Sequence, residues 1–142
     1  MTPQRVTLIT LGVKDLAASR VFYKALGWVE SPRSQDSVAF FQINCLVLGL
    51  FGLSDLSKDQ GRADALLGTG AMTLAQNFES QAEVDTAFAK ALDCGARELK
   101  APEKVFWGGY SGYYTDPDGH VWELAYNPFW PLHADGSLTL PE

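Results

Sequence analysis

The segment Val105–Pro128, VFWGGYSGYYTDPDGHVWELAYNP, decides the fold of this chain. It contains two strand-like runs, Tyr110–Thr115 and Val121–Tyr126, which are joined by the turn sequence DPDG at residues 116–119. Proline fixes φ at the second position of a turn, and glycine accepts the positive φ that closes it. Two β-rich runs on either side of such a turn predict a β-hairpin.

The second run contains a carboxylate in an otherwise apolar strand. Side chains alternate between the two faces of a strand, so Val121, Glu123 and Ala125 share one face. Trp122 and Leu124 share the opposite face, which we expect to pack on a helix. Burying an unpaired carboxylate is costly, so we expect Glu123 to be hydrated, hydrogen-bonded, metal-bound or facing a ligand.

Composition limits the class of protein. The chain has 142 residues, of which 46% are hydrophobic, and a formal net charge of −6, which fits one domain or two small modules that share a core. No basic cluster is present to bind nucleic acid or an anionic membrane, and no apolar run could span a bilayer. The N-terminus lacks the layout of a signal peptide, and the two cysteines suggest buried thiols rather than a zinc site. We expect a soluble, cytoplasmic protein.

The first half of the chain is predicted as a strand, a helix and three further strands. The strand 6–13 is followed by a helix that begins after an Asp15 N-cap and ends at Gly27. A short strand at 28–30 precedes a hairpin of strands 38–43 and 45–51. The polar segment 53–70 is the expected linker, with one short helix at 56–67.

The second half repeats this order of elements. A strand at 72–78 leads into a helix with a Ser80–Glu83 capping box, which ends at Gly95. A short strand at 97–100 and the hairpin 110–126 follow. The pattern Phe-x-Lys-Ala-Leu also occurs in both helices, at 22–26 and at 88–92. Neither half alone buries both faces of a four-stranded sheet, so we expect the two halves to pair.

These pieces together resemble the vicinal oxygen chelate superfamily, which includes glyoxalase I, extradiol dioxygenases and bleomycin-resistance proteins. The resemblance rests on LGVKDL at 11–16, FY at 22–23 ahead of LG at 26–27, DPDGH at 116–120 and EL at 123–124. It implies an α+β fold of paired βαβββ modules whose sheets curl around a cavity, often completed within a dimer. The expected organisation is a single glyoxalase-like domain of module one (5–52), linker (53–70), module two (71–127) and tail (128–142).

In metal-dependent members of that family, four ligands come from the first and last strands of the two modules. The resemblance places these positions at Leu8, near Gly49, near Met72 with Gln76 as the nearest polar alternative, and at Glu123. Catalytic metals prefer His, carboxylate or Cys ligands, and only Glu123 qualifies. His120 and His133 are expected to be exposed turn and tail residues. We therefore expect no metal and no cofactor.

Aromatic side chains are dense around the last hairpin, and packing should account for half or more of them. Trp107, which precedes Gly108-Gly109, is the best candidate for a pocket wall. Alternation separates Tyr110 from Tyr113, but the sequence leaves open which of the two faces a cavity. The candidate ligand-binding residues are Glu123, Trp107, Tyr110, Gln76 and Tyr113.

Three interpretations of function follow. The favoured one is metal-independent binding of a small organic molecule in an aromatic-lined cavity, as in bleomycin-resistance proteins, with Glu123 as the polar anchor. The alternative is a glyoxalase- or lyase-type enzyme in which Glu123 is a metal ligand or general base. The third is a scaffold whose cavity is filled by side chains. A homodimer is expected, because the aromatic tail segment 129–132 needs a surface on which to pack.

Overall fold

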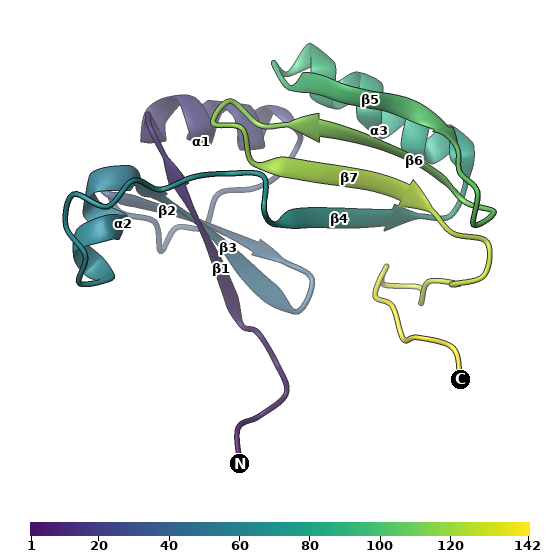
Figure 1. Cartoon of the computed structure of the whole chain (residues 1–142), viewed down its shortest axis with the longest axis horizontal. Helices are drawn as coiled ribbons and strands as arrows, with labels where there is room; N and C mark the ends of the chain where they lie inside the picture. Colours follow the sequence, from purple (N-terminus) through teal and green to yellow (C-terminus); the bar gives the residue numbers. More distant parts are fainter. The chain divides into compact units, whose positions relative to one another are not determined.

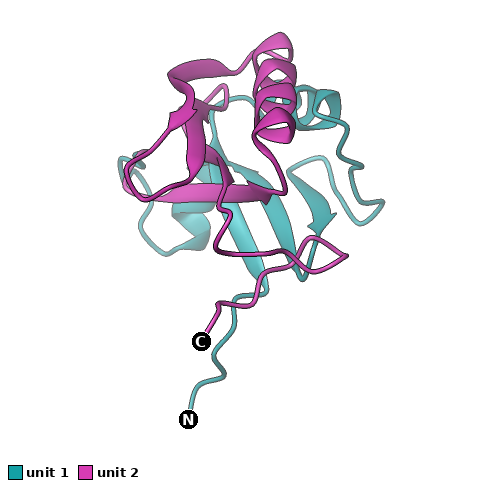
Figure 2. Ribbon diagram, turned by 90° about the vertical axis from the view of Figure 1, so that its right-hand side faces the viewer, with its two compact units in different colours: residues 1–68 teal, residues 69–142 magenta.

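The computed structural model describes residues 1–142 and divides into two compact units. Unit 1 comprises residues 1–68 and unit 2 comprises residues 69–142 (Figure 2). The boundary falls inside the segment expected to be the linker.

Unit 1 is a three-stranded sheet with two helices. Its elements are β1 (Leu8–Val13), α1 (Leu16–Ala25), β2 (Val38–Ile43), β3 (Leu46–Gly52) and α2 (Leu53–Asp59) (Figure 1). The strand order is β1-β3-β2, with β1 parallel and β2 antiparallel to β3. The hairpin between β2 and β3 turns at residues 44–45, as the sequence predicted.

The first helix confirms its sequence signals. The Asp15 side chain accepts a hydrogen bond from the Ala18 N–H, which satisfies a donor in the first turn of α1. The chain leaves the helix through Gly27, whose φ of 99° favours glycine. Phe22 and Tyr23 are buried, and the ring of Tyr23 lies 6.1 Å from that of Phe41 on β2. This contact anchors α1 on one face of the sheet.

Two predictions in unit 1 were wrong in detail. The predicted strand 28–30 is a single bridge between Glu30 and Phe41, and Glu30 forms an ion pair with Arg20 at 3.4 Å. The predicted helix 56–67 is instead α2, which begins at Leu53. A Cβ on Gly12 would lie 2.8 Å from Leu53 Cδ2, so the missing side chain makes room for the start of this helix. The helix position follows from that packing, which no local signal encodes.

Unit 2 is a four-stranded sheet with one helix against it. Its elements are β4 (Thr73–Phe78), α3 (Gln81–Asp93), β5 (Arg97–Lys104), β6 (Tyr110–Thr115) and β7 (Val121–Tyr126) (Figure 1). The order is β4-β7-β6-β5, with β4 parallel to β7 and the other pairs antiparallel. Both units therefore share one topology, with β5 replaced in unit 1 by the Glu30 bridge.

The helix α3 begins with the predicted capping box. The Ser80 Oγ accepts from the Glu83 N–H at 3.1 Å, and the Glu83 carboxylate accepts from the Glu79 N–H at 2.7 Å. The buried face of α3 is formed by Val84, Phe88 and Ala91. This face packs on the sheet, where Tyr114, Trp122 and Leu124 are also buried. No helix in the structure has the length and apolar character that crossing a membrane requires.

The strand β5 is longer than the predicted segment 97–100 and is irregular. Its pairing with β6 shifts register twice, between Glu98 and Lys100 and between Lys100 and Glu103. Pro102 lies in the second irregular stretch and has no N–H to donate to a ladder. A Cβ on Gly112 would meet the Pro102 nitrogen at 2.8 Å, so glycine is required on the facing strand. The strand continues past the proline because this contact is possible.

The turn between β6 and β7 is held by Asp116. Its side chain is 2% exposed, and Oδ1 accepts from the N–H groups of Asp118 and His120, both at 2.9 Å. Gly119 closes the turn with a φ of 95°. The DPDG sequence therefore predicted this turn correctly, and the side chain of Asp116 supplies the hydrogen bonds that hold it.

We predict that Asp116→Ala lowers the free energy of unfolding by about 3 kcal/mol, because two charge-assisted hydrogen bonds are lost from a buried turn. Chemical denaturation of the intact chain measures this. Asp135→Ala is the matched control, since Asp135 accepts from the Ser137 N–H and hydroxyl in the exposed tail and its loss should leave stability nearly unchanged. Equal effects of the two substitutions would contradict a special role for the turn.

Candidate functional site

The register of β7 decides which side chains share a face with Glu123. Glu123 pairs with Ala75 on β4 and with Tyr113 on β6. Paired residues on neighbouring strands point to the same side of a sheet, whereas the flanking Trp122 and Leu124 point to α3. We call the side opposite α3 the Glu123 face. On β4, β7 and β6 it comprises Thr73, Ala75, Asn77, Val121, Glu123, Ala125, Ser111, Tyr113 and Thr115.

The Glu123 carboxylate is half-buried and is held by one neighbour. The Tyr113 hydroxyl donates a hydrogen bond to Glu123 Oε2 at 3.1 Å. Partial burial, this hydrogen bond and the nearby negative charge together raise the pKa of Tyr113 above its ordinary value. No cation of unit 2 forms an ion pair with Glu123. The carboxylate is therefore not one half of a salt bridge within this unit, and its second oxygen remains free to accept from another donor.

Two further polar side chains flank the glutamate. Asn77 on β4 and Ser111 on β6 both pair with Ala125, one step along β7 from Glu123. Ser111 is only 3% exposed, whereas Asn77 is half-buried. Neither residue was a candidate in the sequence analysis. Alternation along β6 does place Ser111 on the same face as Tyr113.

Two of the sequence candidates lie on the helix side of the sheet, opposite the Glu123 face. The Tyr110 hydroxyl donates to Asp85 Oδ1 of α3 at 2.6 Å, which places Tyr110 on the helix side and raises its pKa. Gln76 pairs with Leu124, so it also shares the helix side. The sequence does not show where the pairing of β4 with β7 begins, so it left the face of Gln76 open. The parallel register starts at Thr73 and puts Ala75, rather than Gln76, beside Glu123.

Trp107 lies on the loop between β5 and β6 and is 38% exposed. Its ring occupies the space into which a Cβ on Gly109 would project, with ring carbons 1.8 Å from that position. The indole therefore covers Gly109, the residue that directly precedes β6.

A metal site of the type implied by the resemblance does not fit these residues. In unit 1, Leu8 Cδ1 lies 3.5 Å from the Cβ position of Gly49, so the two inferred positions are neighbours and neither has a ligand atom. In unit 2, the strand partner of Glu123 is Ala75. Met72 precedes β4 and Gln76 lies on the other face. Neither unit contains three His, Cys, Asp or Glu side chains grouped to hold a metal ion.

One histidine belongs to the turn between β6 and β7, and the other belongs to the tail. His120 belongs to the turn, where its N–H donates to Asp116. The ring of His133 lies 2.8 Å from the Thr139 hydroxyl in the exposed tail. Neither of these two contacts involves Glu123.

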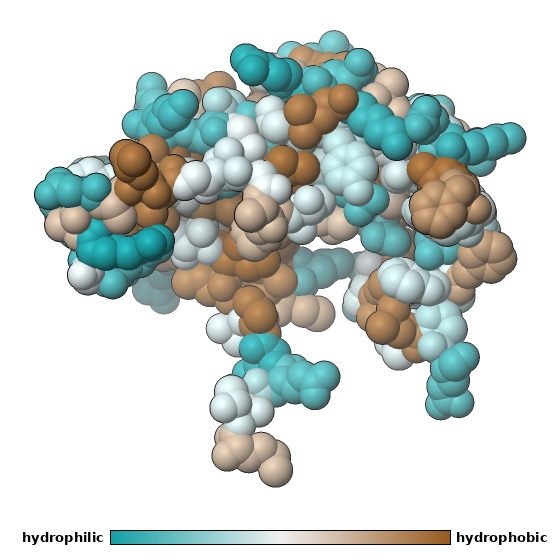
Figure 3. All heavy atoms as spheres, viewed as in Figure 1, coloured by the Kyte–Doolittle hydropathy of each residue, from teal (hydrophilic) through white to brown (hydrophobic).

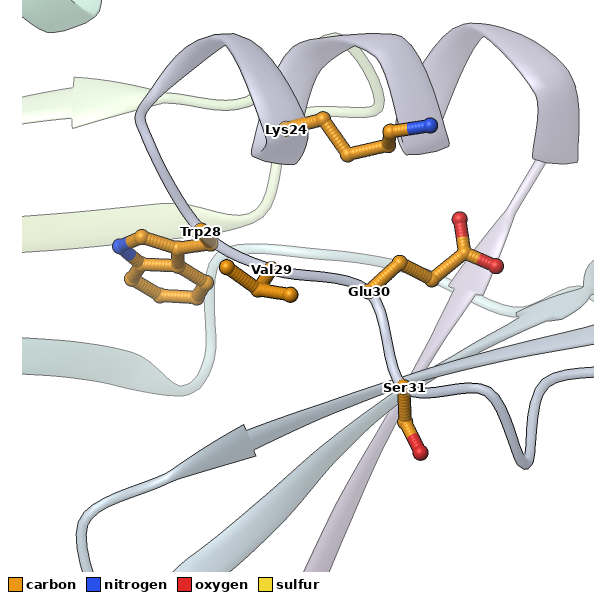
Figure 4. Close-up of a pocket in the computed structure, with 5 residues that line it drawn as sticks. All are labelled: Lys24, Trp28, Val29, Glu30 and Ser31. Atoms are coloured by element: carbon orange, nitrogen blue, oxygen red, sulfur yellow. The ribbon is translucent and has the colours of Figure 1, made fainter.

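Unit 1 has a shallow, open pocket of about 470 Å³ that the sequence did not indicate. It is lined by Lys24, Trp28, Val29, Glu30 and Ser31 (Figure 4). The side chains of Lys24 and Glu30 approach the pocket from α1 and from the following loop, whereas Val29 is 82% exposed. The sequence predicts a strand over residues 28–30 and therefore does not indicate a pocket there.

Comparison with known proteins agrees with this architecture. A glyoxalase-related enzyme from Fulvimarina pelagi is 37% identical, has a TM-score of 0.90, and is matched over 99% of this chain and 100% of its own. The metallothiol transferase FosB of Lysinibacillus sphaericus is 28% identical over 126 residues, which are 87% of this chain and 83% of that protein.

A shorter match is to an uncharacterized protein of Mycobacterium bovis, which is 43% identical over 42 residues, or 30% of this chain. The chain thus spans only 28% of the length of that relative. The model of the Glyoxalase/Bleomycin resistance protein/Dioxygenase superfamily matches residues 5–124, which include both sheets and most of the last hairpin. The chain therefore belongs to the glyoxalase/bleomycin resistance protein/dioxygenase superfamily.

Proposed function

We propose that this chain binds a small organic molecule, without a metal, on the Glu123 face of unit 2. The observation that supports this most directly is the environment of Glu123. Its carboxylate is half-buried, accepts from Tyr113, and lacks a cation partner within the unit. A carboxylate in that position is stabilised by a donor from water or from a ligand. Ala75, which pairs with Glu123 on β4, is exposed.

Metal independence is supported by the donor set. A divalent catalytic metal requires several His, carboxylate or thiolate ligands around one point. Leu8, Gly49 and Met72 stand at the other three positions that the resemblance implies, with Gln76 as the nearest polar alternative, and none of these has a His, carboxylate or thiolate group. One glutamate alone is too weak a site for a catalytic metal.

The second candidate function is a metal-free enzyme of the glyoxalase or lyase type. The observation that favours it is the Tyr113–Glu123 hydrogen bond, which combines a potential proton acceptor and a phenol on one face. The chain is also similar to proteins described as an enzyme and as a transferase. In that case Glu123 would be the catalytic general base, removing a proton from a bound substrate.

A homodimer is part of the proposal. Large apolar side chains stay exposed along the C-terminal tail, where Figure 3 shows hydrophobic side chains on the surface. They are Phe129, Trp130, Leu138 and Leu140. Exposed apolar groups of this size are usual at subunit contacts. A cytoplasmic location is also part of the proposal.

We predict that Glu123→Gln leaves the melting temperature nearly unchanged and lowers the pKa of Tyr113. The amide oxygen can still accept from the Tyr113 hydroxyl, while the negative charge that helps raise this pKa is removed. Thermal denaturation and tyrosine titration by ultraviolet absorbance measure the two quantities. The pKa of Tyr110 is the internal control, because it depends on Asp85 and should not move.

A stability loss of about 3–5 kcal/mol in Glu123→Gln would instead indicate that the glutamate is one half of a buried ion pair. That result would overturn the assignment of Glu123 to a ligand site. Glu123→Gln should also lower the affinity of the protein for any small molecule that binds the Glu123 face.

Elemental analysis of protein purified without chelator should find no stoichiometric divalent metal, because the inferred ligand positions lack donors. Glu123→Gln is the matched variant. A finding of about one zinc, nickel, manganese or iron per chain that disappears in this variant would refute metal-independent binding.

We predict that light scattering at micromolar concentration gives the mass of two chains. Trp130→Ser should shift the equilibrium toward the single chain, because it removes an exposed aromatic side chain from the tail. Val21→Ser, at an exposed position on α1, is the control and should not change the mass. A single-chain mass for the unmodified protein would exclude the homodimer.

A further inference from the structure

We propose that the open pocket of unit 1 is a further binding site, and that it takes a small aromatic carboxylate. The pocket forms where the chain leaves α1 and runs toward β2. Its volume of about 470 Å³ lies within the range of about 300–1,000 Å³ that is usual for small-molecule sites. The residues that line it belong to unit 1, so the proposal is independent of the function proposed for the Glu123 face.

The pocket has an aromatic side and a charged side. The indole of Trp28 lies on one side, whereas the ammonium of Lys24 and the carboxylate of Glu30 lie on the other (Figure 4). Val29, which lines the pocket next to Trp28, is 82% exposed and adds apolar surface. A ligand that fills such a pocket has an apolar part and a charged group.

The aromatic side is held in place by the core of unit 1. The ring of Trp28 lies 5.6 Å from that of Tyr23 on α1 and 6.4 Å from that of Phe41 on β2, and both of these neighbours are buried. Trp28 itself is half-buried, and its uncovered part lines the pocket. A wall that is already fixed loses little conformational freedom on binding, and an indole packs well against a flat aromatic ring.

The pairing of Glu30 argues against a cationic ligand. Its carboxylate lies 3.4 Å from Arg20 Nε, and the Arg20 guanidinium also donates to the backbone carbonyls of Gln35 and Val38. These contacts fix the guanidinium beside Glu30, so the glutamate has its counter-charge within the fold. A ligand ammonium would have to compete with Arg20 for this carboxylate.

Lys24 supplies the charge that the ligand complements. It takes part in no ion pair, and it lies in the last turn of α1, where the helix dipole favours a positive charge. The segment 16–34 has the cations Arg20, Lys24 and Arg33 against the single anion Glu30, although the whole chain has a net charge of −6. A carboxylate on Lys24 therefore gains a charge-assisted hydrogen bond in a locally cationic part of the chain.

Three probes with one carbon skeleton test the proposal. Phenylacetate, phenylacetamide and phenethylamine have the same aromatic ring and differ in a terminal group that is anionic, neutral or cationic. In titrations of the intact chain followed by NMR of backbone amides, phenylacetate should cause saturable shifts at residues 24–31. Phenylacetamide should bind at least about fivefold more weakly, and phenethylamine should bind more weakly than the amide.

A lysine variant tests the charged contact. Lys24→Gln should weaken phenylacetate about fivefold to tenfold, which is the loss of one charge-assisted hydrogen bond, and should leave phenylacetamide nearly unchanged. Lys58→Gln is the matched control, because Lys58 is also an exposed lysine in the last turn of a unit 1 helix. It should bind all three probes as the unmodified protein does.

A valine variant tests the apolar contact. Val29→Ser should weaken phenylacetate and phenylacetamide by the same factor of about two to five, because it removes apolar surface that both probes cover. Val21→Ser, at an exposed position on α1 outside the pocket, should change neither affinity. Both valines are exposed, so melting temperatures should stay nearly constant.

The proposal is overturned if phenylacetate causes no saturable shift at residues 24–31 up to about 20 mM, a concentration that detects weak ligands. It is also overturned if phenethylamine binds as tightly as phenylacetate, or if Lys24→Gln binds phenylacetate unchanged. Glu123→Gln should bind phenylacetate as the unmodified protein does, since Glu123 belongs to unit 2. Loss of binding in that variant would assign the ligand to the Glu123 face instead and would refute a site in unit 1.

Discussion

The Asp116 carboxylate fixes the pairing of β6 with β7, and the rest of unit 2 depends on that pairing. By accepting two N–H groups inside a buried turn, it fixes the length of the connection between the strands. The length of a hairpin turn sets its register. A slip of one residue would move Trp122 and Leu124 away from α3 and would bring Glu123 into the core. The free energy cost of burying that carboxylate therefore reinforces the register that the turn selects.

The same register separates two environments across one sheet. On the helix side, Phe88 of α3 packs edge-on against Tyr114, with ring centroids 6.3 Å apart, and burial raises the pKa of that tyrosine. On the other side, Tyr113 is half-buried and donates to Glu123. Two adjacent tyrosines thus have different roles, one in packing and one in orienting a carboxylate. The alternation of β6 alone explains the difference.

The sequence predicted the hairpin, both capped helices and the face of Glu123, because turn residues, caps and alternation are local signals. It failed where the outcome depended on a contact between distant residues. The start of α2 depends on the space above Gly12, and the extent of β5 depends on Pro102 meeting Gly112. The sequence could not show on which face Gln76 lies. Alternation shows which residues of β4 share a face, but it does not show how they pair with β7.

The two units show how one topology can supply different chemistry. Gly49 of β3 has the place in unit 1 that Glu123 has in unit 2, and its strand neighbours are Thr10 and Phe40 rather than Ala75 and Tyr113. A glycine beside a phenylalanine offers neither a ligand atom nor a hydrogen bond from the side chain. Chelation needs donors from several strands at once, whereas hydrogen bonding to a ligand needs only one oriented acceptor with polar neighbours. In unit 2, Glu123 is such an acceptor, and the Tyr113 hydroxyl donates to it. The residues of this chain therefore favour recognition by hydrogen bonds over recognition by a metal.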